Sequence, residues 1–199
     1  MRPTYRTTLL ALALLLPAAG WRAYNERLTL QPAQSRIWVE GTSTIRAFTC
    51  TAGVINALVD TRTANAIPLL LIGDKAVVAV DVKVPVEKLD CGNGTMNEHM
   101  LRSLKSNENP TILFRLTSYE IAKASGAATG TLKGTLSLGG VQKPVSITAE
   151  GKPEGEMLRV SGSTEVLMTQ YDLTPPTLMF GRIKVNEKMI VKFDLLLKN

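Results

Sequence analysis

The sequence predicts an all-β protein in which eight antiparallel strands close into one barrel that carries a single short helix. Two observations predict this fold. From residue 27 onward, short stretches alternate between apolar and polar residues, and glycine, proline and asparagine separate them. The sequence also has no long alternation of strands with helices, which a parallel sheet would need. Closure removes exposed sheet edges, and a barrel of about eight strands can enclose one small ligand.

The clearest strand covers residues 78–84, where every second residue is valine and where Asp81 and Lys83 lie on the opposite face. A period of two with one polar face is typical of a half-buried antiparallel strand. Val78 and the three valines after it are therefore expected to point inward. Similar patterns predict strands within residues 28–30, 37–39, 47–50, 112–117, 131–138, 145–149, 158–168 and 189–195. Gly139 and Gly140 are expected to form the turn of a hairpin.

One helix is predicted before Pro110. Thr95, followed three residues later by Glu98, matches a capping box, which marks the start of a helix. Met100 and Leu104 lie on one face of this helix at a spacing of four residues. The segment is only about ten residues long, so we expect it to cover part of the barrel rather than to form a domain.

Residues 1–20 are predicted to be a secretory signal peptide. A basic start precedes an apolar run at residues 9–16, and small residues follow at 17–20. The apolar run is much shorter than the ~20 residues that span a bilayer, and the alternative is a short anchor or a buried helix. We therefore expect residues 21–199 to form one domain of a periplasmic or secreted protein.

The net charge of +6 falls to +4 without Arg2 and Arg6 of the leader, because 21 basic and 17 acidic residues remain. The basic residues are scattered and do not form the patch with interleaved aromatic residues that nucleic-acid binding needs. No nucleic-acid partner is therefore expected. A mild attraction to anionic lipid headgroups, and thus a transient membrane contact, is compatible with this charge.

Cys50 and Cys91 are the only cysteines of the chain. An oxidising compartment favours a disulfide between them, and the bridge would close a loop of about 40 residues, worth about 4 kcal/mol in the chain-entropy model. The alternative is a pair of unpaired buried thiols.

The sequence offers no residue set for catalysis, so we expect a binding protein and not an enzyme. His99 is the only histidine, and neither a phosphate-binding glycine loop nor a paired Cys-x-x-Cys occurs. One cluster suggests an alternative function, since Cys91, Met96, His99 and Met100 are ligand types that suit Cu(I). The competing interpretation is a disulfide at Cys91 beside ordinary core and surface residues, and on it we expect no metal or other cofactor.

Several segments, in order, resemble the YceI-like, polyisoprenoid-binding periplasmic proteins. The matching stretches are residues 35–45, 88–92, 96–100, 109–114 and 134–145. The resemblance implies a lipocalin-like barrel of eight strands, often dimeric, without catalytic residues. It also implies an isoprenoid lipid, such as a prenylated quinone or a polyprenyl phosphate, inside the barrel.

The leading hypothesis is thus a carrier that holds a long apolar lipid by burial alone. The inward residues expected to contact the lipid are Val80, Val82, Phe114, Leu116, Leu136, Ile147, Val166, Met168, Val191 and Phe193. Flexible methionines and small inward residues such as Ala149 and Gly162 fit a roomy interior. The third alternative is a barrel with a filled core that serves as a structural or interaction module.

Overall fold

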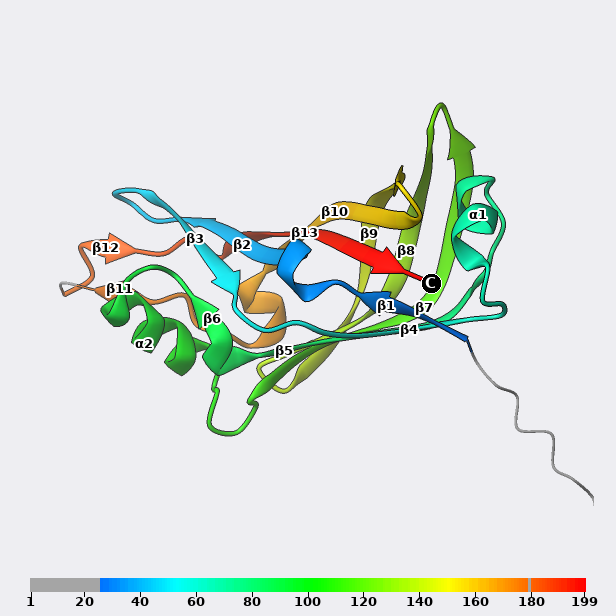
Figure 1. The fold of residues 1–199 in the computed structure, drawn as a ribbon. Coiled ribbons are helices and arrows are strands. Elements are labelled where there is room, and N and C mark those ends of the chain that lie inside the picture. Colours follow the sequence, from blue (N-terminus) through cyan, green and yellow to red (C-terminus); the bar gives the residue numbers. More distant parts are fainter. Residues whose placement is uncertain (1–25, 179) are drawn as a thin grey trace, which may run out of the picture.

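The computed structural model describes residues 26–178 and 180–199. These residues form a closed antiparallel barrel of eight strands, which confirms the predicted fold class (Figure 1). The predicted signal peptide, residues 1–20, lies outside the described residues. None of the helices in the described ranges has the length and apolar character needed to cross a bilayer.

Five barrel strands are continuous: β7 (Thr111–Ala124), β8 (Ala127–Leu138), β9 (Val141–Glu154), β10 (Met157–Leu167) and β13 (Lys188–Lys198). Each of the other three consists of two segments in line. These pairs are β1 (Glu26–Leu30) with β2 (Arg36–Thr42), β3 (Ala47–Ala52) with β4 (Asn56–Thr61), and β5 (Val77–Pro85) with β6 (Leu89–Asp90). Short 3-10 helices, η1 (Pro32–Gln34) and η2 (Val86–Lys88), interrupt the first and third of these strands.

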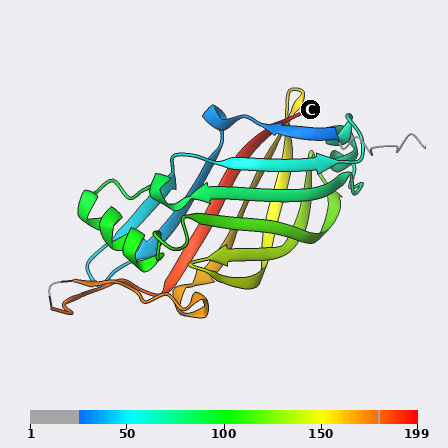
Figure 2. The same cartoon turned by 90° about the horizontal axis from the view of Figure 1, so that it is seen from below.

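The barrel closes between the first and last strands of the chain. Both β1 and β2 lie along β13: Leu30 pairs with Leu197, and Ile37 pairs with Phe193. From there the order runs through β4, β5, β7, β8, β9 and β10 back to β13. Figure 2 shows these strands side by side around the barrel. Every barrel strand therefore has a neighbour on both sides, although some ladders are short, such as that of β7 with β5 over residues 111–115. Pairing on both sides protects the sheet edges.

Different elements cover the two ends of the barrel. Helix α1 (Ala66–Leu71) joins β4 to β5 and contacts β8 and β9 on the far wall, and we call this the α1 end. The 3-10 helix η3 (Met168–Tyr171) packs against β9 and β10 at the η3 end. Helix α2 (Gly94–Ser103) and the small hairpin of β11 (Thr177–Leu178) and β12 (Ile183–Lys184) lie away from α1 (Figure 1).

The predicted start of the helix is wrong by two residues. Asn93 is the N-cap, and its side-chain oxygen accepts a hydrogen bond of 3.0 Å from the Met96 amide. Asparagine is among the strongest N-cap residues, so the helix begins before Thr95, which falls within its first turn. The expected capping box of Thr95 and Glu98 is therefore not the cap that the structure has.

The predicted inward position of Val78 is also wrong. Thr61 pairs with Val77 and Asp60 pairs with Ala79, so Val78 is an extra residue in β5. Such a bulge shifts the inward and outward positions of the residues that precede it in β5 by one residue. Val77 consequently faces the barrel interior, while Val78 is 53% exposed.

Candidate functional site

The barrel encloses an apolar cavity of about 240 Å³. All eight barrel strands contribute to its wall, and Leu70 of α1 contributes at one end. The lining is apolar except for Tyr119, two threonines and two glutamates. The volume lies just below the range of about 300–1,000 Å³ that is typical of pockets for small ligands. An enclosed space of this kind can hold an apolar molecule by burial.

Eight of the ten residues predicted to contact a ligand line this cavity. They are Val80, Val82, Phe114, Leu116, Leu136, Ile147, Val191 and Phe193. Val166 and Met168 are buried, but they belong to a packed cluster with Tyr171 and Leu173 at the η3 end. The reason is that β10 ends at Leu167 and the chain turns into η3, which brings Met168 across the end of the barrel. The role of all ten residues in ligand binding stays a prediction.

Several lining residues were missed because two elements were missed. Strand β4 contributes Ala57 and Val59, and α1 contributes Leu70. Residues 56–61 contain only three consecutive apolar residues, without a clear alternation, so the strand was hard to detect. The apolar run at 67–72 with Pro68 in its first turn is compatible with a helix. Tyr119 and Ile121 were missed because β7 extends to Ala124, well beyond the predicted strand.

Two phenylalanine rings lie over glycines of neighbouring strands. A Cβ atom on Gly134 would come within 2.5 Å of the Phe114 ring, and one on Gly162 would come within 2.6 Å of the Phe193 ring. The glycines thus give each ring a place against the wall instead of in the middle of the barrel. This arrangement keeps interior space free while both rings stay packed.

One part of the barrel wall lacks a backbone ladder in the described structure. The pairing of β5 with β7 stops at Asp81 and Arg115, although β5 continues to Val77. Above this point, the register of β7 against β8 shifts between Leu116 and Ser118, and such a bulge increases the local twist. In Figure 1 the upper parts of β7 and β8 rise away from β4 and β5.

The side chain of Tyr119 bridges this gap. Its hydroxyl accepts a hydrogen bond of 3.0 Å from the Val77 amide and faces the Val77 carbonyl at 3.4 Å. Burial raises the pKa of the Tyr119 phenol, so the hydroxyl stays protonated at neutral pH. Lys75 forms a 3.0 Å ion pair with Glu120 beside it. Since Val77 and Tyr119 line the cavity, these contacts lie at the part of the cavity wall where the ladder is missing.

Glu120 and Glu150 are the charged residues at the cavity wall, and the side chains of both are exposed to solvent. Both are paired, Glu120 with Lys75 at 3.0 Å and Glu150 with Lys152 at 2.7 Å. The rest of the lining therefore offers a ligand no charge partner, and burial and shape decide what it can hold.

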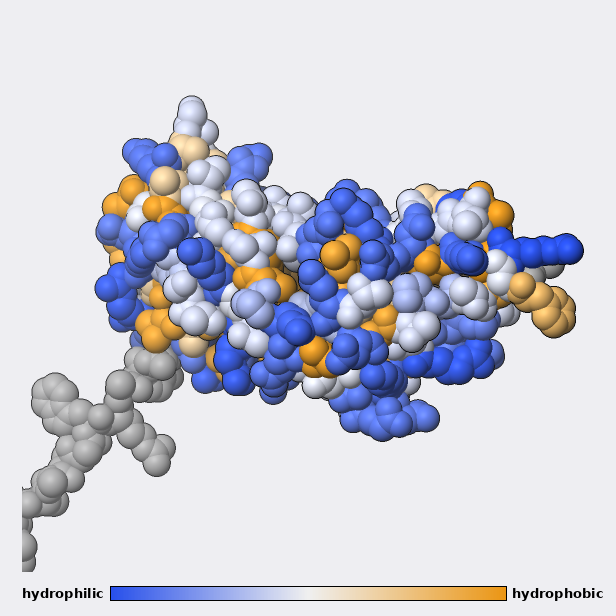
Figure 3. All heavy atoms as spheres, turned by 180° about the vertical axis from the view of Figure 1, so that it is seen from behind, coloured by the Kyte–Doolittle hydropathy of each residue, from blue (hydrophilic) through white to orange (hydrophobic). Residues whose placement is uncertain are grey.

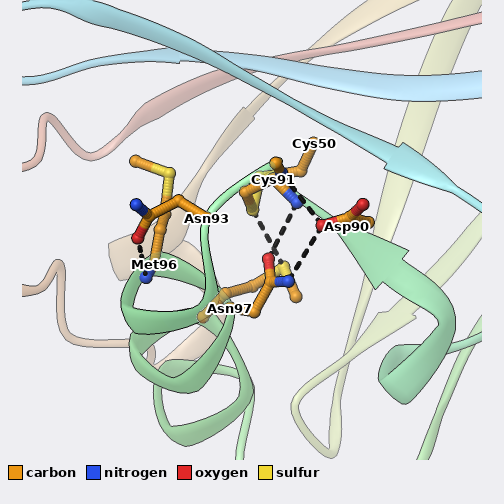
Figure 4. The surroundings of a disulfide bond; sticks show 8 residues. Cys50, Asp90, Cys91, Asn93, Met96 and Asn97 are labelled. Carbon is orange, nitrogen blue, oxygen red and sulfur yellow. Dashed lines mark hydrogen bonds between the residues drawn. A yellow bond between two sulfur atoms is a disulfide. The ribbon is translucent and has the colours of Figure 1, made fainter.

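The predicted disulfide between Cys50 and Cys91 is present and fastens the loop before α2 to β3 (Figure 4). Asn97 organises this loop, since its side-chain oxygen accepts from the Cys91 amide at 2.8 Å and its nitrogen donates to Asp90 at 2.9 Å. The hydrogen bonds that Asp90 accepts from Asn97 and from the Gly92 amide lower the pKa of its carboxyl.

The disulfide removes the thiolate from the alternative copper site. The Met100 sulfur lies 3.6 Å from the Cys91 sulfur, and because a disulfide carries no proton, this is a van der Waals contact. His99 lies instead with its Nδ1 atom 3.0 Å from the Arg102 guanidinium. Within residues 26–178 and 180–199, no group of three or more His, Cys, Asp or Glu residues could hold a metal ion.

Comparisons with known proteins agree with this architecture. A search of the curated proteins found no match. BcnA from Burkholderia cenocepacia is similar in structure, with a TM-score of 0.65 at 14% identity over 84% of this chain and 99% of that chain. A polyisoprenoid-binding domain from Saccharophagus degradans gives a TM-score of 0.61 at 11% identity, over 88% of this chain and 99% of that chain.

A YceI protein from Campylobacter jejuni gives a TM-score of 0.58 at 16% identity, over 74% of this chain and 82% of that chain. Identities this low show a shared fold and no more. The model of the YceI-like domain, however, matches residues 28–197, which is nearly the whole barrel. The chain therefore belongs to the YceI-like domain family.

Proposed function

We propose that this protein is a periplasmic carrier that holds the chain of an isoprenoid lipid inside its barrel. The observation that carries the proposal is the cavity inside the barrel, whose lining is almost entirely apolar. The structurally similar polyisoprenoid-binding domain from Saccharophagus degradans supports this class of ligand. The disulfide supports an oxidising compartment such as the periplasm.

The binding energy comes from burial. An isoprenoid chain that buries about 300 Å² gains roughly 7 kcal/mol at 25 cal/mol per Å². Part of this gain offsets the cost of ordering the chain and of lost translational freedom. A ligand in the cavity also replaces empty space, whose presence costs a folded protein stability.

We expect a neutral headgroup, such as that of a prenylated quinone, rather than a polyprenyl phosphate. The charged lining residues, Glu120 and Glu150, are carboxylates that lysines already neutralise. A phosphate inside the apolar cavity would lose hydration without gaining a cation. Homodimer formation and transient membrane contact stay predictions of the family resemblance and of the net charge.

The test is organic extraction of the mature protein purified from a bacterial periplasm, followed by mass spectrometry of the extract. Wild-type protein should yield an isoprenoid lipid in a fixed ratio to protein. The Ala149→Phe variant fills the cavity and should lose the lipid, while the Thr148→Phe variant, whose side chain faces outward on the same strand, should keep it.

Val80→Phe is a second filling variant in case Ala149→Phe does not fold, and circular dichroism reports folding of all variants. A wild-type extract without isoprenoid lipid would refute the carrier function. Equal lipid content in folded wild-type, Ala149→Phe and Val80→Phe proteins would show that the lipid binds outside the cavity.

A further inference from the structure

Two hairpins project together beyond the η3 end of the barrel. One is the turn between β2 and β3, and the other contains β11 and β12 (Figure 1). The Thr44 amide donates to the Lys184 carbonyl at 2.9 Å, and the Asn186 amide donates to the Thr42 carbonyl at 2.9 Å. An isolated bridge between Ser43 and Val185 continues this contact. The hairpins therefore form one projecting unit with a defined relative position.

The most exposed large apolar side chains of the described residues lie on this unit. Phe180 is 109% exposed and Ile45 is 65% exposed. Phe180 also has a φ of +55°, a conformation in which asparagine is far more common than a bulky aromatic residue. The chain thus keeps a phenylalanine where its backbone is unfavourable and where the described residues leave its ring fully exposed, which points to a role outside the chain.

Basic residues lie close in the sequence to these two apolar residues. Arg46, Arg182 and Lys184 are exposed, and none of them forms a salt bridge within the described part of the chain. The nearest carboxylates on these segments are engaged elsewhere, Glu40 with Lys192 and Glu187 with the Thr169 hydroxyl. We call Ile45, Arg46, Phe180, Arg182 and Lys184 the tip. Figure 3 shows apolar side chains next to strongly hydrophilic ones at the end of the molecule farthest from the grey trace.

We propose that the tip docks on the surface of an anionic phospholipid bilayer. Phe180 and Ile45 enter the boundary between headgroups and acyl chains, and the three basic side chains contact the lipid phosphates. Apolar burial together with attraction to anionic lipids is how peripheral proteins bind membranes. The inference goes beyond the proposed carrier function and does not depend on what the barrel contains.

The experiment measures co-sedimentation of delipidated mature protein with vesicles. One set of vesicles contains phosphatidylcholine alone, and the other contains phosphatidylcholine with phosphatidylglycerol. Wild-type protein should bind the mixed vesicles more tightly. Phe180→Asn should lower the partition constant roughly tenfold, because the burial of one aromatic side chain is lost.

Asparagine tolerates the positive φ of this position, so Phe180→Asn should be at least as stable as the wild-type protein. A loss of binding in this variant can therefore not be attributed to unfolding. Val78→Thr is the matched control, since it removes an exposed apolar group on β5, outside the tip, and should leave binding unchanged. The double variant Arg182→Gln/Lys184→Gln should lose about 25-fold on mixed vesicles, at about fivefold per basic residue, and nothing on phosphatidylcholine alone.

The proposal would be overturned if wild-type protein and Phe180→Asn bound the mixed vesicles equally tightly. It would also be overturned if Val78→Thr lowered the partition constant as much as Phe180→Asn does. If wild-type protein ignores both vesicle types but forms a concentration-dependent dimer that Phe180→Asn abolishes, the tip is a contact between two copies and the membrane proposal is wrong. Neither result bears on lipid found in the barrel by extraction, so this proposal and the carrier function can fail separately.

Discussion

Packed apolar side chains close both ends of the barrel, but only the wall beside α1 has a gap in its backbone ladder, between β5 and β7. At the η3 end, Val166, Met168, Tyr171 and Leu173 form a buried cluster that Leu104 of the α2 region joins. At the α1 end, a helix of six residues buries Ala66, Ile67 and Leu70 in the main core cluster, while the wall beside it is bridged by the Tyr119 side chain.

This difference indicates which part of the barrel can move. Opening the η3 end would expose a buried apolar cluster, which costs several kcal/mol. Opening the gap between β5 and β7 would break the contacts of one tyrosine, one exposed ion pair and the packing of the half-buried Val77 and Ile121, while the ladders on the other sides of β5 and β7 stay intact. We therefore expect the η3 end to be a fixed floor and a ligand to enter and leave beside α1.

The largest effect should come from the disulfide that holds the loop before α2. The double variant Cys50→Ala/Cys91→Ala should lower the free energy of unfolding by about 4 kcal/mol, because the unfolded chain regains the freedom of a loop of about 40 residues. Urea denaturation measures this, and reductant added to the wild type is the control. A loss below about 1 kcal/mol would mean that the bridge does not restrain the unfolded chain as this model requires.

A smaller loss is expected at the floor itself. Met168 is 7% exposed within the cluster, so Met168→Ala should cost about 3 kcal/mol through lost burial and the cavity left behind. Gln170→Ala, an exposed neighbour on η3, should change stability by less than about 0.5 kcal/mol. If Met168→Ala costs no more than Gln170→Ala, the floor is as loosely closed as the α1 end and the comparison fails.

The alternation of apolar residues was sufficient to predict most of the barrel. The hairpin that turns at Gly139 and Gly140 joins β8 to β9 as expected, with Leu138 opposite Val141. Residues on regular strands, such as Val80, Val82 and Ile147, were placed on the cavity side because a period of two assigns each side chain to one face.

The errors occur where the period breaks. Val78 was misplaced because a bulge inserts one residue into β5, and the register that decides this lies in β4, a distant part of the sequence. Met168 was misplaced because the strand pattern continues past the residue at which the chain leaves the sheet. The hydrogen bond between the Tyr119 hydroxyl and the Val77 amide could not be predicted from the sequence, since it depends on how far β5 and β7 separate in space.

Tyr119→Phe should have a moderate and local effect. The variant keeps the ring but removes the acceptor of the Val77 amide, which should cost about 1 kcal/mol and favour the open gap by roughly fivefold. Hydrogen exchange of the Val77 amide, which loses its acceptor, should speed up by at least that factor, and release of a bound lipid should speed up by about fivefold. Unchanged exchange at Val77 would show that Tyr119 does not hold the gap closed.

The smallest effect is expected from the ion pair of Lys75 and Glu120 beside Tyr119. The side chains of Lys75 and Glu120 are 51% and 74% exposed, and pairs this accessible to water typically contribute only a few tenths of a kcal/mol. Lys75 also lies 5.9 Å from the Tyr119 ring centre, near the limit of a cation–π contact, which adds little at an exposed site. Lys75→Gln should therefore speed hydrogen exchange of the Val77 amide by less than about threefold. Added salt, which screens the ion pair, should speed this exchange in the wild-type protein by no more than that. A larger acceleration in Lys75→Gln than in Tyr119→Phe, reproduced by salt, would mean that charge rather than the tyrosine hydroxyl closes the α1 side of the barrel.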